Sequence, residues 1–92
     1  MRGKQVFEHN WDQMVAAGID IARVEISDTF DKGPEYKIRN EDGTFVVFGP
    51  EYEGGRLQGW TYASYNDEGG VIAIDGGPAF SDVAERIAKF TH

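Results

Sequence analysis

The sequence contains no cysteine and only two histidines, His9 and His92, near opposite ends of the 92-residue chain. Without cysteine, neither disulfides nor thiolate metal sites can hold the fold together. The two histidines could share a metal ion only if both ends of the chain met, and neither sits in a recognisable ligand spacing. The sequence therefore predicts no metal centre.

Long apolar runs are absent as well. No window is long enough to cross a membrane. The positive charges at Arg2 and Lys4 are not followed by the hydrophobic stretch of a signal peptide. We therefore expect a cytoplasmic protein that does not bind membranes.

Positive charge is scarce, with nine Lys and Arg against sixteen Asp and Glu and a net charge of −7. Because phosphate binding depends on clustered Lys and Arg, we expect no direct binding to nucleic acid. An acidic surface suits a basic protein partner. It also serves solubility, which is the simpler explanation of the charge.

The polar residues are not arranged for catalysis. No histidine is placed to act as a base for any of the three serines, which are Ser27, Ser64 and Ser81. Ser81 is better interpreted as the N-cap of a helix. Paired carboxylates such as Glu51 and Glu53 lack the apolar surroundings that would raise one pKa. The segment Gly76-Gly77-Pro78 lacks the Lys and Ser or Thr of a phosphate loop. We expect no enzyme activity and no cofactor.

Helical periodicity marks both ends of the chain. A first helix is predicted over residues 7–17, where apolar residues recur on one face and Gly18 provides a stop. A second helix is predicted over residues 78–90. There, Asp82 near the start and Lys89 near the end match the helix dipole.

Between the helices the hydrophobic period falls to two, which predicts strands over residues 23–30, 35–39, 44–48, 57–65 and 71–74. The segments Asn40-Glu41-Asp42-Gly43 and Asn66-Asp67-Glu68-Gly69 predict hairpin turns. Short hairpins between successive strands indicate an antiparallel arrangement. The chain is therefore predicted to be a single α+β domain over residues 1–92. In that domain an antiparallel β-meander of about five strands is flanked by an N-terminal and a C-terminal helix.

The third predicted strand, residues 44–48, is apolar on both faces, which is typical of a central strand covered on both sides. Gly49-Pro50 predicts its end, because proline cannot donate to the ladder. Residues 51–56 are then expected to form a loop.

The fourth predicted strand alternates small and large side chains. Gly59 and Ala63 share one face, while Trp60 and Tyr62 share the other. We expect the helices to approach the small face and to leave the two aromatics opposite them. The reverse arrangement would bury Trp60 and Tyr62, which stabilises by about 1.5–3 kcal/mol for each side chain. Of the two arrangements, the one that buries Trp60 and Tyr62 is slightly favoured.

The leading functional hypothesis is a small acidic, non-enzymatic binding module that blocks or modulates an unidentified partner protein. If the aromatic face is exposed, contact would use aromatic anchors and an acidic rim. The anchors would be Trp60, Tyr62, Phe48 and Tyr52, and the rim Glu51, Glu53, Asp67 and Glu68. The composition resembles that of small phage-encoded or mobile-element inhibitors and of bacterial immunity proteins, a likeness that assigns no residue a role.

Three alternatives stay open. The acidic surface could mimic nucleic-acid phosphates and occupy a basic groove, in which case binding should fall steeply with salt. A sheet edge or aromatic face could instead join two copies into a homodimer. An enzyme of unknown class is the last alternative.

Overall fold

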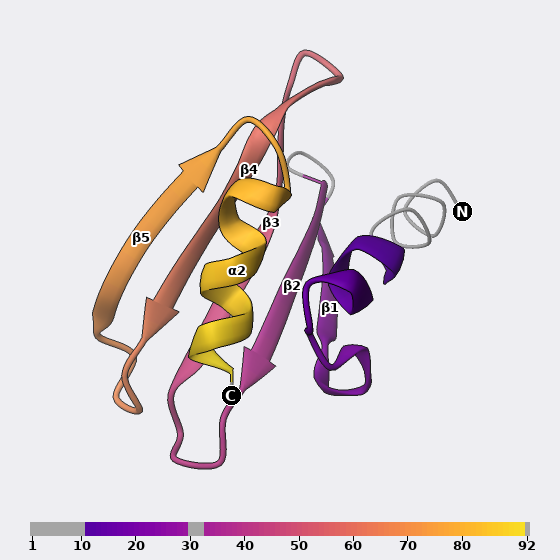
Figure 1. Ribbon diagram of the computed structural model, residues 1–92. Helices are drawn as coiled ribbons and strands as arrows, with labels where there is room; N and C mark the ends of the chain where they lie inside the picture. The colour runs from indigo at the N-terminus through magenta and orange to yellow at the C-terminus, as the bar shows by residue number, and fades with distance from the viewer. Residues whose placement is uncertain (1–10, 30–32, 92) are drawn as a thin grey trace.

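The computed structural model describes residues 11–29 and 33–91. Its strands form one antiparallel sheet whose spatial order, β1-β2-β3-β4-β5, is the order of the chain. The predicted meander is confirmed, and so is the helix near each end (Figure 1).

The strands are β1 (Glu25–Thr29), β2 (Gly33–Arg39), β3 (Phe45–Glu53), β4 (Arg56–Tyr65) and β5 (Val71–Gly77). The chain is helical over 11–16, where the described part of the first helix lies, and a short 3-10 helix, η1 (Ile21–Arg23), precedes β1. The C-terminal helix is α2 (Ser81–Phe90). The start predicted for the first helix lies outside the described residues.

Tight turns set the register of the meander. In the turn between β2 and β3, the Asn40 N–H donates to the Thr44 carbonyl at 2.8 Å. Gly43 there has a φ of 91°, a conformation that side chains other than glycine rarely adopt. The Asn66 N–H donates in the same way to the Gly70 carbonyl at 2.8 Å. Both predicted hairpins are confirmed.

Strand β3 is longer than expected. It continues through Gly49 and Pro50 to Glu53, so the predicted stop at Gly49-Pro50 and the loop over 51–56 are wrong. The reason lies in the neighbouring strand, because the pairing of β3 with β2 reaches only Phe48. Beyond that residue β3 pairs with β4 alone. On the side that is left unpaired, the missing N–H of Pro50 removes no ladder hydrogen bond.

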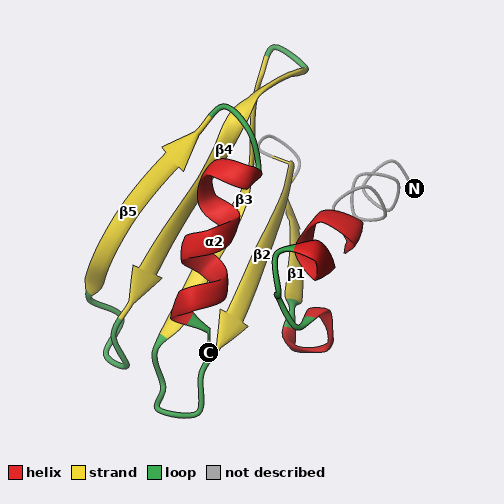
Figure 2. Cartoon of the chain, in the orientation of Figure 1, coloured by secondary structure: helices red, strands yellow, loops and turns green. Residues whose placement is uncertain are grey.

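The core lies between one face of the sheet and the helices. Tyr36, Phe48 and Tyr62 occupy one cross-strand row on this face. Helix α2 contacts β4 and β5 and contributes the fully buried Val83 and Ile87 to the core. The helical segments lie on the same side of the sheet (Figure 2).

Trp60 and Tyr62 belong to this core, with only 5% and 8% of their surface exposed. The Trp60 ring packs edge-on against Phe80, with centroids 4.8 Å apart, and lies nearly parallel to Tyr36 at 6.5 Å. The burial alternative is therefore confirmed, and the expectation that the helices cover the small-residue face is wrong.

Strand packing explains the small residue at position 59. A Cβ atom at Gly59 would lie 2.6 Å from the Gly77 carbonyl oxygen, closer than such atoms approach in real proteins. The glycine therefore admits the neighbouring backbone of β5, and not a helix. The large apolar area of Trp60 then decides which face is covered.

The start of α2 also differs from the prediction. Its N-cap position is Phe80, which makes no side-chain capping bond, so Ser81 is not the cap. The Asp82 carboxylate instead accepts the Ala79 N–H at 2.8 Å. The side chain of Phe80 is 5% exposed and fills the core beside Trp60, so packing determines the residue at this position.

Candidate functional site

The face of the sheet opposite the helices carries no described element, and we call it the uncovered face. Lys37, Val47, Ala63 and Ile74 form one cross-strand row on it, from β2 to β5. The first three are half-buried, whereas Ile74 is 71% exposed. The uncovered face therefore presents aliphatic side chains to the outside.

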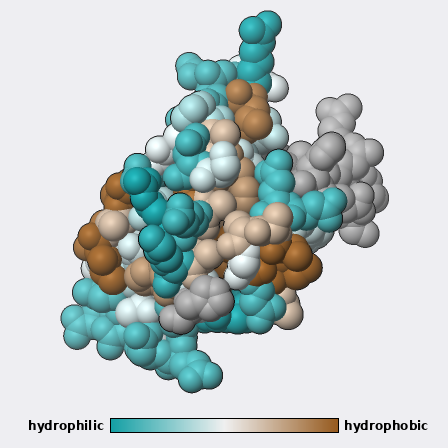
Figure 3. Space-filling model, viewed as in Figure 1, coloured by the Kyte–Doolittle hydropathy of each residue, from teal (hydrophilic) through white to brown (hydrophobic). Residues whose placement is uncertain are grey.

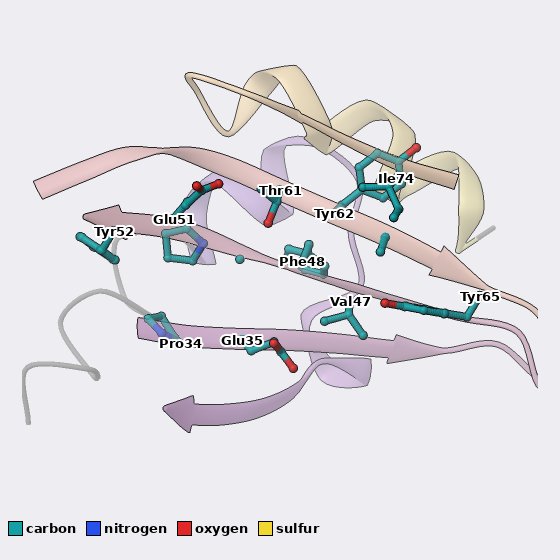
Figure 4. Close-up of a pocket in the computed structure, with 13 residues that line it drawn as sticks. Pro34, Glu35, Val47, Phe48, Glu51, Tyr52, Thr61, Tyr62, Tyr65 and Ile74 are labelled. Atoms are coloured by element: carbon teal, nitrogen blue, oxygen red, sulfur yellow. The ribbon is translucent and has the colours of Figure 1, made fainter. Parts of the chain in front are cut away.

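A hollow of about 490 Å³ lies on the uncovered face (Figure 4). Small side chains from β3 and β4 make room for it, including Gly49, Thr61 and Ala63. Val47 and Ile74 contribute apolar surface to its lining. The hollow is thus an apolar depression spanning the central strands and β5.

One end of the hollow is aromatic. The rings of Phe45 and Tyr65 stack with centroids 4.8 Å apart and an interplanar angle of 18°. The Lys37 Nζ atom lies 4.3 Å from the centre of the Phe45 ring. Stacked rings of this kind add about 0.5–1.5 kcal/mol beyond the burial of their area. These contacts make a preorganised platform at the surface.

The rest of the lining includes negative charge. Glu35 on β2 and Glu51 on β3 are exposed and border the hollow (Figure 4). Within the described ranges neither carboxylate forms an ion pair, whereas Glu25 on the same face accepts from Arg39 at 2.9 Å. The hollow therefore combines an apolar floor with uncompensated carboxylates.

The structure separates the predicted site residues into two groups. Trp60, Tyr62 and Phe48 have 8% or less of their surface exposed and lie on the covered side of the sheet. Their rings pack into the core, which leaves little of their surface for contact with a partner. Tyr52 and Glu51 border the hollow, to whose lining Phe48 and Tyr62 also contribute.

The predicted rim is also divided. Glu53 lies at the end of β3, next to the β3–β4 turn, while Asp67 and Glu68 lie in the β4–β5 turn. The whole length of β4 separates the two positions. All three side chains are exposed, and none of them borders the hollow.

Sequence reasoning missed Glu35, Val47, Ala63, Tyr65 and Ile74 as site residues. A signal for them was present, because the apolar residues on both faces of the third strand indicated a second buried face. The structure confirms the central position of β3 but covers only one of its faces with described residues.

Other kinds of site find little support in the described residues. No three His, Cys, Asp or Glu side chains among them gather closely enough to hold a metal ion, and His9 and His92 lie outside that part. The pKa of Asp42 is lowered, chiefly by the Thr44 hydroxyl, in a turn that does not border the hollow. No helix in the described part is both long and apolar enough to span a membrane.

These features define a small α+β protein with helices on one sheet face and an apolar hollow on the other. Comparisons with models of known protein families, with curated proteins and with solved structures find no match for this chain. Its function is therefore argued from its own surface.

Proposed function

We propose that the protein is a non-enzymatic protein-binding module whose uncovered face receives a partner segment that is apolar in the middle and basic at its flanks. One observation carries this proposal. The central strand β3 is apolar on both faces, yet described residues cover only one of them. On the other face Phe45 and Val47 stay half-buried.

The apolar part of the binding surface supports contact with a bulky side chain. Val47, Ala63 and Ile74 border a hollow with small residues at its floor. Removing such surface from water contributes about 25 cal/mol for each Å². An apolar anchor on the partner would fill the hollow and bury these three residues.

The charges favour a basic partner. Glu35 and Glu51 form no ion pair with a described residue, and the whole chain carries −7. Attraction between complementary charges accelerates association, and salt weakens that attraction. Apolar contact persists at higher salt. We therefore expect binding that salt reduces but does not abolish. A nucleic-acid mimic, which depends on charge alone, would lose its target.

The test is a comparison of immobilised variants exposed to bacterial lysate at low and at moderate salt. Thr61→Arg places a large cation in the hollow, and its exposed position leaves the core untouched. Gln58→Arg is the matched control, because Gln58 is exposed on the same strand and does not border the hollow. Circular dichroism verifies that both variants are folded.

We expect that the wild type and Gln58→Arg retain one protein from the lysate. The folded Thr61→Arg variant should lose that protein. Amide shifts of the wild type on adding that protein should then concentrate on residues of the uncovered face. Equal retention by all three proteins would overturn the assignment of the surface. Complete release at moderate salt would favour the nucleic-acid mimic instead.

A further inference from the structure

Strand β5 is an edge of the sheet that is open to pairing. It pairs with β4 alone, so no described strand faces its outer side. Val71, Ile72 and Ile74 are 58%, 53% and 71% exposed. Apolar surface gathers along the β5 edge in Figure 3. Half of this strand is therefore an apolar ribbon with free backbone groups.

Two of the usual protections of an edge strand, charge and proline, are missing from this half, although the pairing of β5 with β4 shifts register there, between Ser64 and Tyr65. Natural edges carry charges, proline or bulges that discourage pairing with another chain. The run Val71-Ile72-Ala73-Ile74 contains no charge and no proline. The one acid of β5, Asp75, is ion-paired with Arg86 of α2. The opposite edge, β1, is only five residues long and carries Glu25 and Asp28.

We propose that two copies of the chain associate through β5, pairing antiparallel about a two-fold axis so that their sheets become continuous. A second copy is the occupant favoured here because an antiparallel strand pair is self-complementary, with each chain supplying the same surface. Residues 71–74 are also the part of the edge where two chains of charge −7 approach with least repulsion, because this run is uncharged.

The geometry of β5 decides what such a pair would bury. Ile74 pairs with Ala63 and Val71 pairs with Tyr65, which places both residues in the cross-strand rows of the uncovered face, and the register shift between these pairs falls at Ile72. Pairing would bring the exposed apolar side chains of residues 71–74 of the two copies together across the junction. A seven-residue strand is short, and contacts below about 1,200 Å² are typically weak. The dimer should therefore depend on protein concentration.

Sedimentation velocity of the full chain over a wide concentration range tests the association. Ile72→Lys puts a charge on the edge, and Leu57→Lys is the matched control, since these residues are 53% and 52% exposed. We expect Ile72→Lys to raise the dimer dissociation constant about tenfold or more, because like charges then meet across the strand pair. Leu57→Lys should leave it unchanged. A wild type that stays monomeric, or equal effects of both variants, would overturn the proposal.

Cysteine cross-linking tests the geometry, because the chain contains no cysteine of its own. Single cysteines at 71, 72, 73 and 74 should form an intermolecular disulfide most readily at the position nearest the two-fold axis. Leu57→Cys is the control and should not cross-link. Equal cross-linking at all five positions would contradict a fixed antiparallel pair.

The dimer and the partner-binding function can fail independently. Ile74 belongs to both surfaces, but neither Val71 nor Ile72 borders the hollow, and Thr61 does not lie on β5, so variants at Ile72 and Thr61 test one surface each. Thr61→Arg should therefore dimerise like the wild type, and Ile72→Lys should still retain the lysate protein. A Thr61→Arg variant that no longer dimerises would overturn the edge pairing.

Discussion

The Nη1 atom of Arg23 lies 2.8 Å from the carbonyl oxygen of Thr91, so the last residue of η1 holds the end of α2. Its Nη2 atom donates to the Arg39 carbonyl and to Asn40 Oδ1, both at 2.8 Å. Asn40 Nδ2 in turn donates to the Phe90 carbonyl at 2.9 Å. This Arg23–Asn40 clamp joins the helix end, the β2–β3 turn and the start of the sheet.

Replacing Arg23 by Ala should lower the free energy of unfolding by about 1.5–3 kcal/mol, because hydrogen bonds from a charged donor are lost and carbonyls are left unpaired. Arg23→Lys should not restore the stability, since an ammonium cannot reproduce the planar fork. Urea unfolding measures both effects. Arg56→Ala is the control, removing the same charge from an exposed residue outside the clamp. Equal losses in Arg23→Ala and Arg56→Ala would show that the clamp contributes nothing.

Trp60→Ala should destabilise the protein by about 3–5 kcal/mol, since the indole is 5% exposed and packs against Phe80 and Tyr36. That is a large part of the stability of about 5–10 kcal/mol expected for so small a domain. Urea unfolding followed by near-ultraviolet circular dichroism provides the measurement. Tyr52→Ala, at the rim of the hollow, should cost much less. A Trp60→Ala protein as stable as the wild type would place Trp60 outside the core.

Local chemistry made the element order and the turns predictable. Asn40 and Gly43 carry the turn signal within four residues, so no distant contact is needed to read it. The covered face was different: alternation separates Trp60 from Ala63 but does not say which of them faces the helices. That choice depends on the total area buried by strands and helices together.

The same distinction applies to the candidate site. Glu51 and Tyr52 were identified among possible contact residues, whereas Glu35 was not, because its position beside the hollow depends on where β2 lies against β3. Pro50 shows the same limit. Whether the missing N–H of Pro50 ends the strand depends on how far the neighbouring strand β2 extends. The local sequence around Pro50 does not contain that information.

Asp42 should titrate below its ordinary range. The Thr44 hydroxyl donates to its carboxylate at 2.6 Å and the Thr44 N–H at 3.0 Å, and these bonds lower the pKa of Asp42. A lowered folded-state pKa stabilises the fold above the unfolded value, near pH 4, and that contribution is lost as the pH falls through the folded value. Thr44→Val removes the hydroxyl, so the pKa of Asp42 should rise. Carbon-13 titration of the carboxyl carbon in both proteins checks this, and identical curves would contradict it.

Two small residues of β4 should respond differently to enlargement. Gly59→Ala should cost about 1–3 kcal/mol, because the new methyl group would meet the Gly77 carbonyl oxygen at 2.6 Å and force the strands apart. Ala63→Val should change stability by less than about 0.5 kcal/mol, because Ala63 faces the hollow, where an added group meets no helix. Chemical denaturation separates the two. If Ala63→Val were the more damaging change, some part of the chain would have to cover the uncovered face. Binding of the lysate protein should show the reverse order, because the valine fills part of the hollow that the partner's apolar anchor needs.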